Sequence, residues 1–488
     1  MSGGPSSRTR TSRLRVAYPV ERVREPQAGS TSRCFGHVCR YADGRPPIVR
    51  CVDRRRFLGC AAAVGAGLSG TAALAGCARD DDALTFFFQA RPEEARVRMR
   101  IIDAFQRRHP DIRVRTVLSG PDPLQQMLTY CAGGKCPDVL MAWELLYAGL
   151  ADRGVLLDLN TMLGRDPRYA AQLRADSAPA LYDTFAFKGA QYALPEQWSG
   201  VFLFYNTALF EQAGVAPPPA RWTEAWTFAE FLAAAQAITK RDRSGRIARY
   251  GFVDAWVPYL SAACFGMNNG AEWFRPAVNP TAHGLADPRF TAGFQFYADL
   301  AIKHRVAPKP AEVQAVSTQD LFLSGRAGMM MGGHWLYSEV VGADNLPFDV
   351  TVLPVGPDAG GRASKSDVGT TGLAIAAGSP RREQAWEFVR FATGPEGQAI
   401  IADSGLFVPV LKSVVHSPAF AAAHAGVRNL EVFTGGLDNS HQFPVTPKWG
   451  EVSATLDRGF NKVLRGAATA DSFRHGLSAD VDRLLGQA

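Results

Sequence analysis

Three signatures of common enzymes are missing from this sequence of 488 residues. It contains no Gly-x-Ser-x-Gly nucleophile elbow and no His-Glu-x-x-His zinc motif. Gly133-Gly134-Lys135 is only a fragment of a phosphate loop, because the rest of that motif is absent. These absences disfavour the serine-hydrolase, zinc-protease and nucleotide-hydrolase classes.

Cysteine is scarce beyond the N-terminal region. Four of the eight cysteines precede residue 77, and after Cys77 only Cys131, Cys136 and Cys264 remain. Outside the cytoplasm, the spacing from Cys131 to Cys136 favours a local disulfide, and two intervening glycines ease its closure. A pair of metal ligands is the alternative, but no second Cys or His pair accompanies it, so we predict no metal site. Cys264 has apolar neighbours and is expected to be a buried free thiol.

A long hydrophobic run is also lacking. The sixteen apolar, mostly small residues 60–75 are too few and too weakly apolar for a membrane-spanning helix, which needs ~20 residues. Arg54-Arg55-Arg56 precedes this run, and Leu74-Ala75-Gly76-Cys77 ends it. A charged flank, a short apolar run and a small-residue exit are typical of an export signal. An Ala-rich core helix is the alternative.

Leu74-Ala75-Gly76-Cys77 resembles a bacterial lipobox, which implies that Cys77 receives lipid and becomes the first mature residue. The arginines followed by Phe57-Leu58 resemble a twin-arginine signal, although Asp53 and Gly59 depart from that pattern. We therefore interpret residues 49–76 as a twin-arginine-like lipoprotein signal peptide; general secretory export stays the alternative route.

Residues 1–48 do not fit an export signal. They are rich in Arg, Ser and Pro, and they are too long for its charged start. We expect this segment to be untranslated or disordered, with translation starting near Val49 or Val52.

Excess positive charge is confined to the N-terminal segment. The whole chain has a net charge of +7, but residues 1–76 alone contribute +9, so the remainder carries −2. A strongly basic balance is typical of nucleic-acid binders. Because the remainder is slightly acidic, we expect no nucleic-acid partner.

The 412 residues after residue 76 are too many for one hydrophobic core and predict two lobes. Apolar strands alternate with helices, which predicts an α/β fold with mostly parallel sheets. The expected strands are residues 83–88, 112–116, 137–141, 155–159, 201–205, 327–331, 350–353 and 373–377. Helices are expected over residues 93–109, from a capping box at Thr227 and Glu230, and around residues 385–391.

Several segments together resemble one family, the extracellular solute-binding proteins, family 1, of ABC importers. The segments are Tyr192-Ala-Leu-Pro-Glu-Gln-Trp-Ser-Gly200, Phe204-Tyr-Asn206, Leu209-Phe-Glu-Gln-Ala-Gly214, Trp226-Thr227, Gly325-Arg-Ala-Gly-Met-Met-Met-Gly-Gly-His-Trp335, Leu353-Pro-Val-Gly356, Gly369-Thr-Thr-Gly372 and Ala385-Trp-Glu-Phe-Val-Arg-Phe391. Each segment is weak alone, whereas their order and spacing are fairly specific. The match runs from about Leu84 to the C-terminus, and the lipobox agrees with it independently.

The resemblance implies a two-lobed periplasmic-binding-protein-like (type II) α/β fold whose chain crosses three times between lobes. The crossings would lie near residues 194–202, 350–356 and 393–398. The first lobe would then comprise residues 84–193 plus 357–393, and the second residues 203–349 plus 398–488. Ligand would bind in the cleft, and the lobes would close over it by hinge motion.

A carbohydrate site needs aromatic rings for the C–H face of the sugar and polar groups for its hydroxyls. Trp143 and Glu144 follow an expected strand, where ligands of α/β sheets gather, and Gln89 follows the first strand. Combined with the family resemblance, these criteria single out Gln89, Trp143, Glu144, Gln197, Trp198, Trp256, Tyr259, His334, Trp335, Thr370, Thr371 and Asp438 as ligand-binding candidates. Core packing, or a surface loop for Asp438, is the alternative for each. Trp226 and Trp386 sit at helix positions and are expected in the core, while Trp222 and Trp273 stay undecided.

The resemblance implies a substrate-binding protein of an ABC importer, anchored by lipid to the outer face of the bacterial cell membrane. We expect a monomer that needs no cofactor, takes a neutral sugar, oligosaccharide or amino sugar, and delivers it to the permease subunits. A glycerophosphodiester is the alternative ligand. The rival classes are an exported glycoside-acting enzyme using Glu144 and Glu196, and a structural or adhesive lipoprotein.

Overall fold

The computed structural model describes residues 82–486 except 121 and 315, without the side chain of Phe473. All of the described residues belong to one compact unit. The predictions on residues 1–48, on the signal peptide at 49–76 and on lipidation of Cys77 therefore lie outside the described residues.

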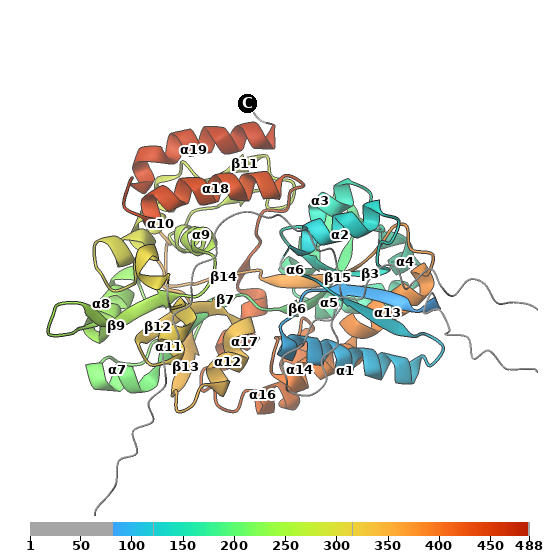
Figure 1. Cartoon of the computed structure of the whole chain (residues 1–488), viewed down its shortest axis with the longest axis horizontal. Coiled ribbons are helices and arrows are strands. Elements are labelled where there is room, and N and C mark those ends of the chain that lie inside the picture. The colour runs from blue at the N-terminus through green and yellow to red at the C-terminus, as the bar shows by residue number, and fades with distance from the viewer. Residues whose placement is uncertain (1–81, 121, 315, 487–488) are drawn as a thin grey trace, which may run out of the picture. The chain divides into compact units, whose positions relative to one another are not determined.

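The first sheet has five strands in the order β2-β1-β3-β15-β6. Its strands are β1 (Leu84–Phe88), β2 (Val114–Leu118), β3 (Val139–Trp143), β6 (Ala193–Trp198) and β15 (Thr370–Ile375). β1 pairs in parallel with β2 and β3, whereas β15 runs antiparallel to β3 and β6. Two long helices, α1 (Pro92–Arg108) and α13 (Arg382–Thr393), pack against each other, and α13 also contacts β15 and β6 (Figure 1).

The second sheet also has five strands, in the order β13-β7-β12-β9-β8. Its strands are β7 (Val201–Asn206), β8 (Lys240–Arg241), β9 (Ile247–Asp254), β12 (Ala327–Gly333) and β13 (Phe348–Thr351). β12 is parallel to β9 and antiparallel to β7, which is itself antiparallel to β13. Helices α8 (Phe228–Ile238) and α11 (Thr318–Leu323) contact β9 and β12. A further layer joins α9 (Pro258–Asn268), α10 (Pro288–Ile302), α18 (Trp449–Leu464) and α19 (Ala470–Leu485), of which α18 and α19 lie side by side at the top of Figure 1.

Shorter elements connect and flank these layers. The helices are α2 (Pro123–Ala132), α3 (Tyr147–Asp152), α4 (Asn160–Arg165), α5 (Pro167–Asp176), α6 (Pro179–Thr184), α7 (Thr207–Ala213), α12 (Tyr337–Gly342), α14 (Pro395–Ser404), α15 (Lys412–Val415), α16 (Pro418–Ala423) and α17 (Glu431–Thr434). Three 3-10 turns are η3 (Pro310–Val313), η4 (His334–Leu336) and η5 (Gly436–Asp438). The two-residue strands are β4 (Ala186–Phe187), β5 (Ala190–Gln191), β10 (Phe274–Arg275), β11 (Ala282–His283), β14 (Ser366–Asp367) and β16 (Ser440–His441).

The chain passes directly from one sheet to the other. β6 ends in the first sheet at Trp198, and β7 begins in the second at Val201, so only Ser199 and Gly200 separate them. The chain returns between β13 and β15. The α/β fold with two sheets is confirmed, but the expectation of mostly parallel sheets is wrong. Both sheets are mixed. In the second sheet β7 pairs antiparallel with β12 and β13, and in the first sheet β15 pairs antiparallel with β3 and β6.

The assignment of each segment to a lobe stays a prediction. Packing differs from it after residue 398, which we expected in the second lobe. α14 contacts α1 and α13 beside the first sheet, Leu411 forms a bridge with Ser177, and η5 contacts α6. Gln398 strengthens the packing of α14 by donating from Nε2 to the backbone oxygen of Glu196 at 2.7 Å.

Local predictions had mixed success. The capping box is confirmed, since the backbone N–H of Thr227 donates to Glu230 Oε2 at 2.7 Å and the N–H of Glu230 donates to Thr227 Oγ1 at 3.2 Å. The strand expected at residues 155–159 is wrong, because pairing there is limited to one bridge, Leu156 to Ala376, before the chain turns into α4. β9 was missed, because Arg249 and Gly251 interrupt its apolar pattern.

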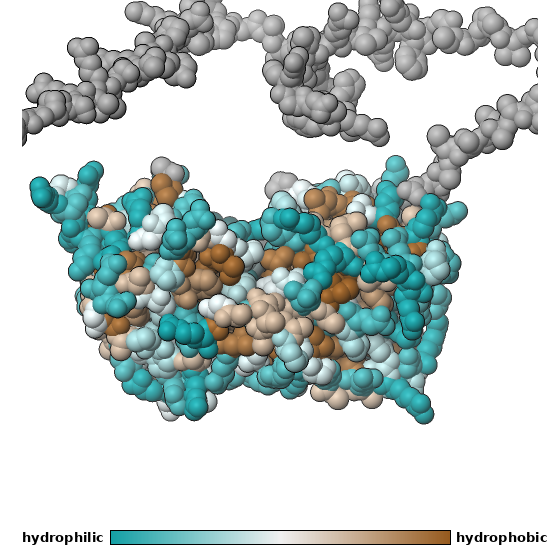
Figure 2. Space-filling model, turned by 90° about the horizontal axis from the view of Figure 1, so that it is seen from below, coloured by the Kyte–Doolittle hydropathy of each residue, from teal (hydrophilic) through white to brown (hydrophobic). Residues whose placement is uncertain are grey.

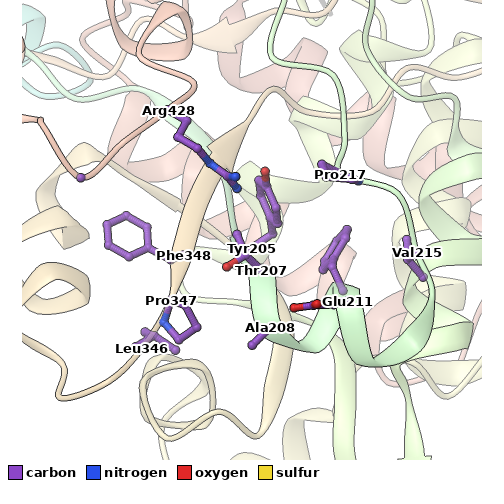
Figure 3. Close-up of a pocket in the computed structure, with 12 residues that line it drawn as sticks. Tyr205, Thr207, Ala208, Glu211, Val215, Pro217, Leu346, Pro347, Phe348 and Arg428 are labelled. Carbon is purple, nitrogen blue, oxygen red and sulfur yellow. The ribbon is translucent and has the colours of Figure 1, made fainter.

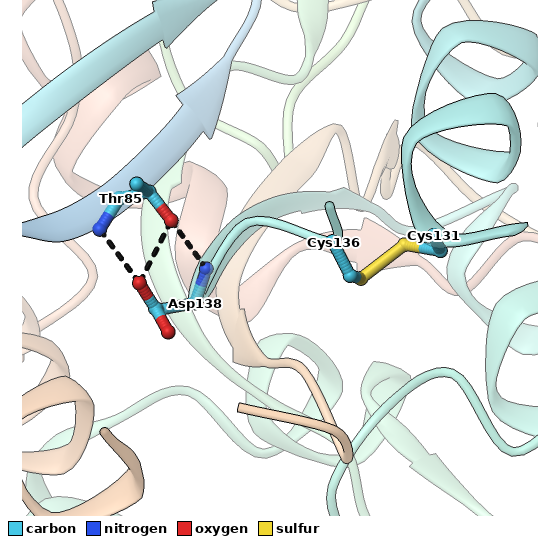
Figure 4. The surroundings of a disulfide bond; sticks show 4 residues. All are labelled: Thr85, Cys131, Cys136 and Asp138. Atoms are coloured by element: carbon cyan, nitrogen blue, oxygen red, sulfur yellow. Dashed lines mark hydrogen bonds between the residues drawn. A yellow bond between two sulfur atoms is a disulfide. The ribbon is translucent and has the colours of Figure 1, made fainter. Parts of the chain in front are cut away.

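A buried carboxylate ties the first sheet together (Figure 4). Asp138 Oδ2 accepts hydrogen bonds from the backbone N–H and the hydroxyl of Thr85, both at 2.8 Å. Its Oδ1 accepts from Ser379 Oγ at 2.6 Å. The disulfide between Cys131 and Cys136 lies just before β3, and Cys264 is buried and free. The start of β3 is therefore fixed by both covalent and hydrogen-bonded contacts.

The face seen in Figure 2 is hydrophilic along its edges, and hydrophobic residues gather toward its middle. Few large apolar side chains of the described residues are exposed, and they are scattered: Met99, Leu118, Val257, Val316 and Val341. Within the described residues, none of the helices has the length and apolar character needed to span a bilayer.

Candidate functional site

A cavity of about 390 Å³ lies where the start of α1, the ends of first-sheet strands and the segment after β12 meet. This volume is within the usual range for small-molecule sites. The lining residues are Gln89, Ala90, Arg91, Glu94, Arg98, Met141, Trp143, Gln197, Ser199, Trp335, Thr371 and Phe407. Because β1 and β3 are parallel, their carboxyl ends meet at one edge of the sheet, which brings Gln89 and Trp143 together.

Three buried polar side chains of this cavity have atoms without a hydrogen-bond partner among the described residues. They are Arg98 (Nε and Nη1), Gln197 (Oε1) and Ser199 (Oγ), whose side chains lie in residues only 3%, 6% and 5% exposed. A buried polar atom left unsatisfied costs about 1–3 kcal/mol. These atoms lie behind the cavity surface with almost no accessible area, so the lining must shift before a polar ligand can bond to the donors of Arg98, the acceptor of Gln197 or the hydroxyl of Ser199.

A hydrogen-bond chain beneath the cavity fixes how these groups point. Gln197 Nε2 donates to Thr371 Oγ1 at 3.0 Å, and Thr371 Oγ1 donates to Glu196 Oε2 at 3.2 Å. The same carboxylate oxygen accepts from Arg98 Nη2 at 3.2 Å. With its Nε2 engaged, the amide of Gln197 leaves Oε1 free, and Arg98 leaves Nε and Nη1 free.

Aromatic rings surround the polar groups. Trp143, Trp335 and Phe407 line the cavity, and the guanidinium of Arg98 lies 5.4 Å from the Phe407 ring centre. The ring of Trp335 continues toward Trp256, with centres 6.3 Å apart. Trp335 itself folds over Gly333, since a Cβ at Gly333 would lie 1.8 Å from its Cζ3. The lack of a side chain at Gly333 thus leaves room for the indole ring.

An ion pair lies at the rim of the cavity. Arg91, at the start of α1, contacts Glu339 of α12, which also accepts from Gln319 Nε2 at 3.1 Å. Arg91 follows a strand of the first sheet, whereas α12 follows β12 of the second. The pair therefore connects elements of the two sheets.

Carboxylates with raised pKa values lie near the passage between the sheets. Burial, followed by the nearby Asp367 carboxylate, raises the pKa of Glu144 from 4.5 to about 8. Burial also raises the pKa of Asp367 to about 6, although the N–H of Val201 donates to it at 2.7 Å and opposes that shift. At neutral pH Glu144 is therefore largely protonated and can donate a hydrogen bond.

The structure brings together part of the predicted ligand-binding set. Five candidates line the cavity: Gln89, Trp143, Gln197, Trp335 and Thr371. Glu144 is the residue after Trp143 but does not line the cavity. Trp256 does not line it either, although its ring lies beside that of Trp335. Tyr259 is half-buried in α9, where burial raises its pKa to about 12 and Ser453 opposes the shift.

Four candidates lie elsewhere. Trp198, His334 and Thr370 are at most 1% exposed, so a ligand in the cavity does not reach them. Trp198 packs into the core against Gly436, and His334 Nε2 faces His424 Nε2 at 2.9 Å. Asp438 is exposed and pairs with Lys412 at 3.1 Å. In this structure these four make core contacts or a surface ion pair, and their contact with a ligand stays a prediction.

Sequence reasoning missed Arg98, Ser199, Phe407 and the supporting Glu196. Arg98 had a recognisable signal, because it shares the helical stripe of Ile101, Ile102 and Phe105 at spacings of three, four and seven. A charged residue on a buried stripe points to a buried partner. Trp222, Trp273 and Trp386 proved to be buried as well.

A larger cavity of about 780 Å³ lies beside α7 and β13 (Figure 3). Arg428 and Tyr205 point toward one another there, and Arg428 Nε donates to Asp349 at 3.2 Å. None of its lining side chains is a buried polar group lacking a partner in the described part of the chain. No predicted ligand-binding residue lines it, so the smaller cavity is the better candidate for a polar ligand.

Groups of three or more His, Cys, Asp or Glu side chains placed to hold a metal ion do not occur within the residues that the structure describes.

Comparisons with known proteins agree on one family. The profile described as "Bacterial extracellular solute-binding protein" matches residues 91–399. The maltotriose-binding protein of Pyrococcus abyssi is 24% identical over 388 residues, covering 78% of this chain and 77% of that protein.

Solved structures share the two-lobed fold. An ABC substrate-binding protein from Listeria monocytogenes in complex with cycloalternan superposes with a TM-score of 0.72 at 23% identity, covering 83% of this chain and 99% of that one. UgpB from Mycobacterium tuberculosis in complex with glycerophosphocholine gives a TM-score of 0.69 at 21% identity, covering 83% and 98%. The predicted two-lobed fold class is confirmed.

Proposed function

The chain belongs to the bacterial extracellular solute-binding protein family, and we propose that it binds an uncharged carbohydrate in the cavity between Trp143 and Trp335. One observation carries this proposal. Buried donors and acceptors without partners, on Arg98, Gln197 and Ser199, lie between aromatic rings.

A sugar ring matches both parts of this cavity. Its C–H face packs on flat aromatic rings, here Trp143 and Trp335, as in most ligand pockets with apolar walls. Each hydroxyl both donates and accepts, so it can accept from Arg98 and donate to Gln197 Oε1. Binding would therefore supply hydrogen-bond partners to atoms that have none among the described residues.

Delivery to a transporter completes the proposal. Cys77 would carry the lipid anchor at the outer face of the cell membrane, and the ligand-bound protein would be recognised by ABC permease subunits. Ligand contacts from both lobes would shift the population toward a closed form. The protein would act as a monomer without cofactor.

A glycerophosphodiester stays the alternative ligand, because UgpB binds glycerophosphocholine on a similar fold. Asp438 lies on the surface, so its charge does not disfavour a phosphate in the cavity. However, Arg98 and Arg91 already pair with Glu196 and Glu339, so neither offers an uncompensated positive charge.

The alternative function, a glycoside-acting enzyme, is not supported by its two candidate carboxylates, Glu144 and Glu196. Glu196 lies beneath the cavity, held by Arg98 and Thr371, and neither it nor Glu144 is part of the cavity lining. A general acid and a second carboxylate would both have to flank the scissile bond.

Thermal-shift screening of the purified protein tests the function. The panel would contain maltotriose, cellobiose, diacetylchitobiose, mannitol and glycerophosphocholine. A ligand at one hundred times its Kd stabilises the native state by ~2.7 kcal/mol, which raises Tm measurably. A shift with at least one saccharide and none with glycerophosphocholine is expected; the reverse result would favour the phosphodiester.

A further inference from the structure

We propose that Glu196 is a positioning residue that sets the charge selectivity of this site, so that it accepts uncharged polyols and rejects anionic sugars. This inference rests on the proposed function. Glu196 is 3% exposed and does not line the cavity, so it acts through Arg98 and Gln197.

The positioning role follows from two contacts of one carboxylate oxygen. Glu196 Oε2 accepts from Arg98 Nη2 and from Thr371 Oγ1, each at 3.2 Å. The first contact engages Nη2 and leaves Nε and Nη1 of Arg98 without a partner among the described residues, and the second holds the hydroxyl that accepts from Gln197 Nε2. The backbone of Glu196 is fixed as well, because its oxygen accepts from Gln398 Nε2 at 2.7 Å.

The selectivity role follows from charge. Without Glu196, the N–H groups of the Arg98 guanidinium that have no partner among the described residues would form a site for a carboxylate or phosphate. Glu196 cancels that charge at 3.2 Å, and Glu94 adds a second carboxylate at the cavity wall. Arg91, the other cation of the lining, is paired with Glu339. An anionic ligand would therefore meet donors whose charge is already compensated, whereas a hydroxyl needs only their hydrogen bonds.

The variant Glu196→Gln preserves the shape of the side chain and removes its charge. Isothermal titration would compare cellobiose, maltotriose and diacetylchitobiose with two anionic probes, cellobiuronate and digalacturonate. We expect the wild type to bind at least one neutral saccharide and neither anion. In Glu196→Gln, neutral affinity should fall at least tenfold while an anionic probe gains at least tenfold, reversing the preference.

Two further variants separate this role from a loss of structure. Thr371→Val breaks the link to Gln197 but keeps both charges, so it should weaken neutral binding without admitting anions. The double variant Arg98→Met with Glu196→Gln removes both charges and should bind neither the neutral saccharides nor the anionic probes. If the unpaired arginine prevents Glu196→Gln from folding, this double variant is measured in its place. Glu383→Gln, which removes a surface partner of Arg165, is the matched control.

Different results test the proposed function and the selectivity role of Glu196. Wild type that binds none of these saccharides contradicts the proposed function. Wild type that binds a neutral saccharide, with folded Glu196→Gln keeping the same neutral-to-anion ratio, overturns the selectivity role alone. If only the double variant folds, anion binding by that variant overturns the role, because Arg98 is then not the source of the charge.

Discussion

Arg91 and Glu339 form an ion pair although 248 residues separate them along the chain. Arg91 starts the helix after the first strand of the first sheet, and Glu339 lies in α12 after β12 of the second sheet. Their side chains are 43% and 34% exposed, at the rim of the proposed carbohydrate cavity. A contact of this kind favours the arrangement in which the cavity is enclosed.

The first prediction concerns this pair. Glu339→Gln should change the free energy of unfolding by less than ~1 kcal/mol, because the pair is largely exposed to solvent. Carbohydrate affinity should fall roughly two- to fivefold if the pair contributes about 0.4–1 kcal/mol to closure. Titrations at 50 mM and 500 mM salt check the cause: wild-type affinity should fall with salt, and the affinity of the variant should not. An equal salt effect in both proteins would contradict it.

A second prediction concerns Gly333. An added Cβ would lie 1.8 Å from Cζ3 of Trp335 and 2.4 Å from the backbone oxygen of Ser199. Gly333→Ala should therefore displace the Trp335 ring and weaken carbohydrate binding at least tenfold, with a change in tryptophan fluorescence. Gly342→Ala, in α12, is the control because no heavy atom lies within 4 Å of its added Cβ. Wild-type affinity in Gly333→Ala would show that the ring position does not matter.

A third prediction concerns the clamp at Asp138. Its side chain accepts from Thr85 N, Thr85 Oγ1 and Ser379 Oγ, and it is 2% exposed. Asp138→Ala leaves these donors unsatisfied, so urea unfolding should show a loss of about 2–4 kcal/mol. Thr85→Val removes only the hydroxyl and should cost less. Similar losses in both variants would mean that the carboxylate is not the centre of the clamp.

A fourth prediction concerns pH. Glu144 has a pKa of about 8 in the folded protein, raised by burial from 4.5. The folded state thus binds more protons than the unfolded state between these values, so this group destabilises the fold progressively as pH rises from 4.5 to 8. Glu144→Gln should remove this loss, so the variant should gain stability over wild type between pH 5 and pH 8.5, by up to ~5 kcal/mol for the full shift.

Unfolding at pH 5 supplies the reference for Glu144, because residue 144 is uncharged in both folded proteins there and most of the loss has not yet occurred. His441 acts in the opposite direction, since burial lowers its pKa to about 4 and Lys365 adds to the shift. The contribution of His441 to stability is lost as pH falls from 6.5 toward 4. Both proteins contain His441, so this loss cancels in the difference between them. A constant difference between wild type and Glu144→Gln from pH 5 to 8.5 would contradict the assignment.

Much of the fold was predictable from sequence because it depends on local patterns. The strand Val201–Asn206, the helix α1 and the capping box at Thr227 each follow from apolar spacing or from a short motif. The relative direction of strands was not predictable, because β15 enters the first sheet only after more than 170 residues of chain that follow β6.

The site was predictable only in part. The pattern around Gln197 and Trp198 indicates a strand beside the passage between the sheets, but it does not say which side chain faces the core. Trp198 turns into the core because Gly436, distant in sequence, leaves room for its ring. Likewise Glu196 could be understood only once Arg98 was placed 3.2 Å away.

Trp335 provides the most direct test of carbohydrate binding in this cavity. Isothermal titration of Trp335→Ala with the saccharide that binds wild type should show a loss of at least about 30-fold in affinity, as for a central aromatic contact worth ~2 kcal/mol. Trp226→Ala, whose ring stacks on Phe210 away from the cavity, should bind as wild type does. Unchanged affinity in Trp335→Ala would contradict the assignment of this cavity as the carbohydrate site.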